Sequence, residues 1–168
     1  RTSVVGADSN QQASPPVDTL GNSARTVLGV GAHLAHVNHG PGAVTAPLQC
    51  SNCHPVPASI SHSDSTVQLS FGALASSQGS APTWTRGTAT CANSWCHGGN
   101  TRLVGGNRTS VVWTDLNATD CTSCHGNPPP APHVQNNPCG SCHTGYSKTG
   151  ATTGTVSLAT HVNGVIDA

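Results

Sequence analysis

Apolar residues along this chain come in short runs that never build a long periodic segment. The richest run, residues 23–39, contains enough Ala, Leu and Val for a short helix, although Gly29 and Gly31 weaken its middle. Apolar and polar residues alternate over 67–71, which predicts a short strand. Residues 102–113 carry two β-prone runs around a Gly-Gly-Asn turn and predict a hairpin. We therefore expect a mostly irregular, coil-rich fold with a few short helices and β-hairpins.

The length of 168 residues is typical of one domain. Residues 1–22 are polar and contain Pro15-Pro16, so they predict an N-terminal arm. This arm is either a free terminus or a segment that docks on a neighbouring subunit. Residues 23–168 then form the domain itself.

The composition is poor in the groups that stabilise an ordinary globular protein. Charged residues make up 7% of the chain, aromatic residues make up 3%, and methionine is absent. Such a chain buries little apolar surface of its own, so a bound cofactor would have to supply much of the core. The six Lys and Arg residues are scattered singly, which argues against a nucleic-acid partner. No apolar run is long enough to span a membrane.

The eight cysteines form four pairs, and a histidine follows the second cysteine of every pair. The first motif is Cys50, Cys53 and His54, the second is Cys91, Cys96 and His97, the third is Cys121, Cys124 and His125, and the fourth is Cys139, Cys142 and His143. Cys-x-x-Cys-His is the attachment motif of c-type haem: both thiols bond to the porphyrin edge and the histidine ligates the iron. We therefore expect four covalent haem c groups, whose stacked porphyrins form the core.

Two other interpretations of the cysteines stay open. Cysteines two residues apart are also common in zinc sites, and the wider second motif would accommodate a Cys91–Cys96 disulfide beside three haems. Neither explains the histidine after every pair. With 10 histidines in 168 residues, four such coincidences have a chance probability on the order of 10⁻⁵, which favours haem.

The second axial position of each iron requires another ligand or stays open. Without methionine, His/Met ligation is impossible, which leaves bis-His iron or an open face. The candidate distal ligands are His33, His36, His62, His133 and His161. His33, His36 and His39 are three residues apart, as on one side of a helix, although they would equally form a solvated cluster. His62 and His133 each follow a motif histidine by eight residues, which predicts an internal repeat of motif plus distal histidine.

The order of these motifs resembles the CxxxxCH/CxxCH multihaem cytochromes of metal-reducing bacteria. The resemblance covers roughly residues 31–165, from Gly31-Ala-His33-Leu-Ala-His36 through one Cys-x4-Cys-His and three Cys-x2-Cys-His motifs to His161-Val-Asn-Gly. It implies a loop-dominated subunit with closely stacked bis-His haems. It also implies self-association into an extracellular filament, with one haem ligated by a histidine of the adjacent subunit.

The expected function is electron transfer without catalysis, between redox partners and external acceptors. Because haem is attached covalently outside the cytoplasm, we expect an extracellular or cell-surface protein, with the periplasm as the alternative. A soluble tetrahaem shuttle would have the same chemistry without the polymer. A reductase would need an open iron face and nearby acid-base groups, and spare histidines with few Lys and Arg count against it. A zinc-bound structural module is the remaining alternative.

Overall fold

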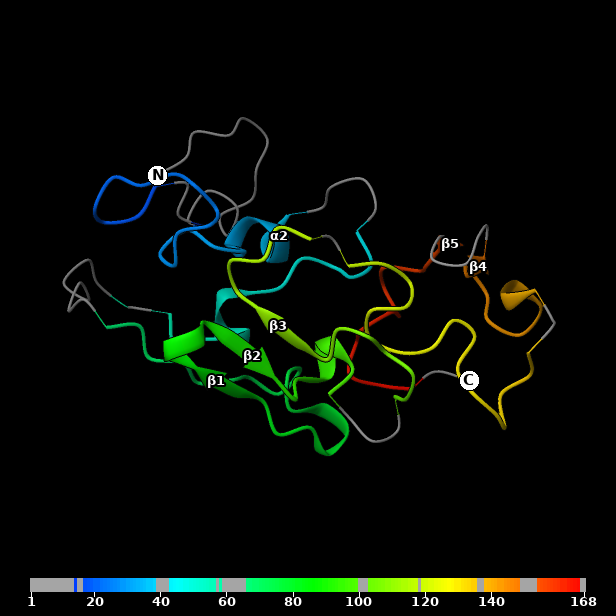
Figure 1. Cartoon of the computed structure of the whole chain (residues 1–168). Helices are drawn as coiled ribbons and strands as arrows, with labels where there is room; N and C mark the ends of the chain where they lie inside the picture. The colour runs from blue at the N-terminus through cyan, green and yellow to red at the C-terminus, as the bar shows by residue number, and fades with distance from the viewer. Residues whose placement is uncertain are drawn as a thin grey trace.

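Regular secondary structure accounts for a small part of the chain (Figure 1). The computed structural model describes residues 14, 17–38, 43–56, 58, 66–99, 103–117, 119–135, 138–148 and 154–166. Its helix and strands are α2 (His33–Val37), β1 (Thr83–Thr85), β2 (Thr90–Ala92), β3 (Ser110–Val112), β4 (Ser147–Lys148) and β5 (Gly154–Thr155). Its 3₁₀ turns are η1 (Cys50–Asn52), η3 (Ser77–Gly79), η4 (Arg86–Thr88), η5 (Trp95–His97) and η6 (Cys139–Ser141). The prediction of a mostly irregular fold with few short elements is confirmed.

Three short strands form an antiparallel sheet in the order β1-β2-β3. Turn η4 connects β1 to β2 as a hairpin, and Trp84 of β1 lies opposite Cys91 of β2, which in turn lies opposite Val111 of β3. The second cysteine pair therefore begins inside the sheet. The small β4/β5 pair lies on the other side of the molecule, and the C-terminal segment passes between the two (Figure 1).

The predicted helix over residues 23–39 is shorter than expected. Only His33–Val37 is helical, and residues 25–32 form successive turns. Gly31 adopts a left-handed backbone with φ of 45°, which ends those turns just before α2. His33 and His36 therefore lie one turn apart on one short helix. His39 lies outside the described residues.

The strand predicted over residues 67–71 is wrong. This segment is extended coil, and its backbone bonds to the first motif instead of to another strand. The Ser70 N–H donates to the Cys53 carbonyl at 3.0 Å and the Gly72 N–H donates to the Asn52 carbonyl at 2.9 Å. The alternation of apolar residues over 67–71 therefore belongs to a segment that lies along the turn of the first motif.

The hairpin predicted over residues 102–113 is not formed within 103–112. Its second half, Ser110–Val112, is strand β3, but β3 pairs with β2. Residues 104–108 bond to the third motif instead. The Gly-Gly-Asn sequence therefore passes along another loop and does not reverse the chain.

The apolar core of the described residues is small. The buried apolar side chains are Val30, Val37, Leu48, Ala75 and Trp95, whereas twelve large apolar side chains are exposed, with Leu20 at 85%. A soluble protein of this length ordinarily buries far more apolar surface. The polypeptide alone has little to hold it together. In the part of the chain that the structure describes, no helix is long and apolar enough to cross a membrane.

Candidate functional site

Three of the four motifs contain a 3₁₀ turn. In the first motif the His54 N–H donates to the Cys50 carbonyl at 3.1 Å, and in the fourth the His143 N–H donates to the Cys139 carbonyl at 2.9 Å. Such a bond closes one turn of chain, so both thiols and the imidazole start from a single turn. The wider second motif differs, because Cys91 lies in β2 whereas its other two residues lie on η5.

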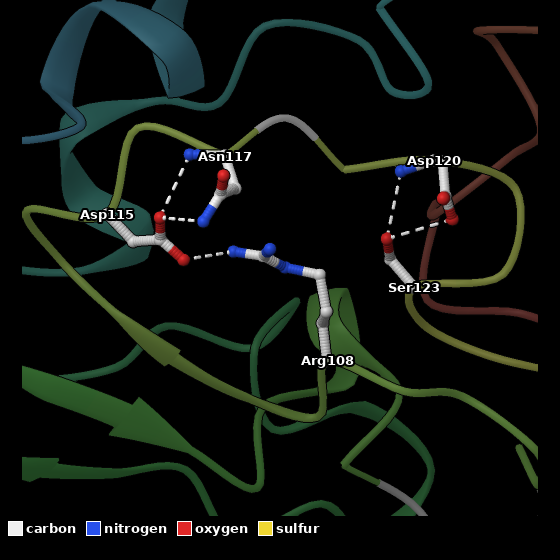
Figure 2. Close-up of polar contacts among 5 residues, drawn as sticks. All are labelled: Arg108, Asp115, Asn117, Asp120 and Ser123. Atoms are coloured by element: carbon white, nitrogen blue, oxygen red, sulfur yellow. Dashed lines mark hydrogen bonds and ion pairs between the residues drawn. The ribbon is translucent and has the colours of Figure 1, made fainter.

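The third motif is held by the neighbouring loop of residues 104–108. The Gly126 N–H donates to the Val104 carbonyl and the Arg108 N–H donates to the Ser123 carbonyl, each at 2.8 Å. Ser123 is fully buried, and its hydroxyl accepts the Asp120 N–H at 2.8 Å (Figure 2). These contacts replace the 3₁₀ turn found in the other motifs.

Arg108 precedes β3, and its side chain reaches Asp115, which follows β3 (Figure 2). Its guanidinium pairs with Asp115 at 2.5 Å, and Asp115 also accepts the Asn117 N–H at 2.9 Å. The Asn117 backbone N–H and then the Arg108 side chain hold the pKa of Asp115 below its ordinary value of 3.8. The positive charge of Arg108 also contributes to lowering the pKa of His97, after burial and the charge of His36. In the sequence Arg108 is one of six scattered cations, and its ion pair with Asp115 is visible only in the structure.

All eight cysteines are free thiols, so no disulfide joins Cys91 to Cys96. Among the described residues, no group of three or more His, Cys, Asp or Glu side chains is placed to hold a single metal ion. Each thiol pair has its own histidine next to it in the sequence.

Three motif histidines each face a histidine from elsewhere in the chain. The ring centroids of the pairs are 6.2 Å apart for His36–His97, 6.2 Å apart for His125–His161 and 6.1 Å apart for His133–His143. The ring planes meet at 71°, 79° and 10° respectively. The three partners are all candidates for the distal position. His133 faces the fourth motif, although its spacing had linked it to the third.

The spacing of these rings fits two imidazoles on opposite sides of one iron. A metal–imidazole bond is about 2.0 Å, and the ring centre lies about 1.1 Å beyond the nitrogen, so two opposed rings have centres about 6.2 Å apart. The observed distances of 6.1–6.2 Å match this value. The residues present therefore fit bis-His iron at the second, third and fourth motifs.

The first motif has a looser partner. The pKa of His33 is lowered, mainly by burial, and the nearby imidazole of His54 contributes to the lowering. His33 is thus near enough to His54 for the charges of the two rings to interact. His62, the other candidate, lies outside the described residues.

Hydrogen bonds orient most of these imidazoles. Nδ1 of six rings lies within 3.1 Å of a backbone carbonyl: His33, His36, His54, His125, His133 and His161. Because a carbonyl oxygen only accepts, Nδ1 carries the proton and the Nε2 lone pair stays available. Histidines that ligate metals almost always make this second bond. This arrangement leaves Nε2 of these rings able to ligate a metal.

His97 differs from the other rings. Its Nδ1 is buried without a hydrogen-bond partner in the part of the chain described. Burial, followed by the charges of His36 and Arg108, lowers the pKa of His97 to about 4. The ring is therefore neutral near pH 7, which is the form that ligates a metal.

Successive motifs are neighbours in space. Burial raises the pKa of the Cys96 thiol to about 11, and the nearby thiols of Cys53 and Cys124 add to the rise. The Cys124 Sγ–H donates to the Cys96 carbonyl at 3.4 Å, which joins the second and third motifs. Tyr146 lies between the fourth motif's histidine and His161, with ring centroids 5.9 and 6.0 Å away. The four motifs thus follow one another in space as they do in sequence.

A hollow of about 290 Å³ opens beside Cys121. Its other lining residues include the apolar side chains of Val44, Val156 and Leu158. The Val44 carbonyl also accepts the Nδ1–H of His161. The hollow therefore lies next to the distal histidine of the third motif and gives an apolar group a place there.

No family model, curated protein or solved structure matches this chain. The family resemblance of the motifs therefore stays a prediction.

Proposed function

We propose that the chain transfers electrons through four covalently attached c-type haems, each with two axial histidines. The observation that carries this proposal is the set of three histidine pairs at 6.1–6.2 Å, each joining a motif histidine to a distant one. The charges of His33 and His54 interact, so we propose His33 as the distal ligand of the first motif. Each motif is then assigned a partner histidine within the chain, three of them from ring geometry.

Each residue of the site has a defined task in this proposal. The eight cysteines anchor the porphyrins, and His54, His97, His125 and His143 ligate iron from one face. A bound haem supplies reversible one-electron exchange at its iron. The distal histidines close the second face, so water and small substrates are kept from the metal. Backbone carbonyls at Nδ1 hold most of these imidazoles in orientation.

The order of the motifs in space supports transfer over catalysis. Neighbouring motifs share contacts from the first to the fourth, so electrons can pass between adjacent groups along the chain. A reductase requires an iron with an open face, whereas the histidines of the second, third and fourth motifs each face another histidine. We propose that the protein is not an enzyme.

Absorption spectroscopy tests this proposal directly. The reduced protein should show the sharp bands of low-spin c-type haem, with four haems per chain, and carbon monoxide should leave the bands in place. A colourless preparation refutes the proposal, and a shift with carbon monoxide refutes bis-His ligation at the affected iron.

The proposed setting is an extracellular filament that carries electrons to external acceptors, as the family resemblance implies. A monomeric tetrahaem carrier is the second candidate, and the three ring pairs within one chain favour it, because the second, third and fourth motifs then need no ligand from a neighbour. Electron microscopy of the native material separates the two. Filaments that lose their order when residues 1–22 are deleted, with haem content unchanged, would support the first. Dispersed particles would support the carrier.

A further inference from the structure

Two aromatic residues contact imidazoles that belong to different motifs. Ring centroids of Trp113 and His33 are 4.8 Å apart at 90°, and those of Trp113 and His36 are 5.6 Å apart at 24°. Tyr146 makes the equivalent contacts to His143 and His161, at 5.9 and 6.0 Å. The chain contains only one Tyr, one Phe and three Trp, so two of five aromatic rings lie in this relation to the site.

Each ring joins two neighbouring sites. His33 is the proposed ligand of the first motif and His36 faces the second, so Trp113 spans these two. Tyr146 likewise contacts two histidines: His143 of the fourth motif, and His161, which faces His125 of the third motif. Together the two rings touch a ligand of all four proposed irons.

Both rings are themselves held in place. The indole Nε1–H of Trp113 donates to the Leu28 carbonyl at 3.0 Å, and its backbone N–H donates to the Ala89 carbonyl at 2.7 Å. The Tyr146 hydroxyl lies 3.1 Å from the Thr160 Oγ1. A ring anchored in this way restricts rotation of the imidazoles packed against it. Such support from outside the ligand set is how proteins orient metal-bound histidines.

We propose that Trp113 and Tyr146 are positioning residues, each of which sets the imidazole orientation at two neighbouring irons. This inference rests on the proposed function, because it needs iron between the paired histidines. The angle between two opposed imidazole planes decides the splitting of the iron d orbitals, and therefore the shape of the low-spin ferric EPR signal. The planes meet at 71° for His36–His97 and at 10° for His133–His143, so the irons should give distinguishable signals.

The experiment uses the full-length, haem-loaded protein with Trp113→Leu or Tyr146→Leu, read by low-temperature EPR and by redox titration. We expect Trp113→Leu to alter two of the four iron signals and two of the four potentials, and Tyr146→Leu to alter the other two. Leu20→Ala is the control, because the Leu20 side chain is 85% exposed and lies outside all four motifs. It should leave all four signals in place.

If a Leu variant does not retain four haems, conservative variants of the same residues provide the test. Trp113→Phe removes the Nε1–H donor but keeps a ring against His33 and His36, so the same two signals should shift less. Tyr146→Phe removes only the hydroxyl contact to Thr160 and keeps the ring, so the two signals should shift less than in Tyr146→Leu. A change at any number of irons other than two, in either Leu variant, overturns the inference. Absence of c-type haem in the unsubstituted protein would instead refute the proposed function.

Discussion

Gly31→Ala is the sharpest test of how the distal histidines are held. Gly31 precedes α2, and its φ is 45°. A Cβ at this position would lie 1.9 Å from Nε1 of Trp113 and within 2.5 Å of two further indole atoms. The indole cannot move freely, because it bonds to the Leu28 carbonyl. The substitution therefore has to displace either the helix that carries His33 and His36 or the indole.

The cost follows from three separate effects. A left-handed backbone costs an L-residue about 1–2 kcal/mol. Crowding a packed site costs about 1–3 kcal/mol, and losing the indole hydrogen bond costs about 1 kcal/mol. We expect Gly31→Ala to lower the free energy of unfolding by about 3–6 kcal/mol, a large part of the 5–15 kcal/mol typical of a domain.

The matched control is Gly79→Ala. Gly79 has a φ of 81°, and a Cβ there would meet nothing within 4 Å. It should cost only the backbone strain, about 1–2 kcal/mol. The denaturation midpoint of the haem-loaded protein, followed by Soret absorption, measures both variants. Equal midpoints for Gly31→Ala and Gly79→Ala would refute the reasoning. Trp113→Leu should relieve the clash, so Gly31→Ala and Trp113→Leu combined should destabilise less than the two separate effects added together.

Further predictions concern the ligands, the charges and the cofactor. His161→Ala should convert one of four haems to a high-spin form that binds carbon monoxide, and an unchanged spectrum would remove His161 as a ligand. His33→Ala should open the iron of the first motif while His62→Ala leaves it closed; the reverse result would assign the ligand to His62. The folded-state pKa of Asp115 is depressed, so its contribution to stability is present above its ordinary value of 3.8 and is lost as pH falls through the lower folded value. Asp115→Asn should therefore flatten the acid side of a plot of unfolding midpoint against pH, and an unchanged acid side would contradict the role of Arg108 as its partner. Protein produced without haem attachment should lack a cooperative unfolding transition, because the described residues bury only five apolar side chains.

Local patterns predicted local structure well. The first and fourth Cys–His motifs are tight turns because the bond from the histidine N–H to the first cysteine carbonyl spans only four residues. Near the end of the chain, Asn163 likewise accepts the Val165 N–H, two residues away, at 2.8 Å. Such contacts form wherever the neighbouring residues allow them.

Patterns that depended on distant partners were predicted poorly. The alternation over residues 67–71 was taken for a strand, yet its backbone bonds to the first motif. The hairpin over 102–113 failed because β3 found its partner in β2. Backbone donors pair with whichever acceptor the tertiary structure brings close, and period-two alternation does not specify that acceptor.

The sequence by itself determined the four Cys–His motifs on which the proposed chemistry rests, because each thiol pair and its histidine lie close together along the chain and need no fold to be recognised. Only the tertiary structure decided which histidine faces which motif. Spacing linked His133 to the third motif, whereas the structure places it 6.1 Å from the histidine of the fourth. The roles of Trp113 and Tyr146 were equally invisible, since each contact joins residues from different loops. Contacts of this kind depend on how loops pack together, which short-range spacing does not encode.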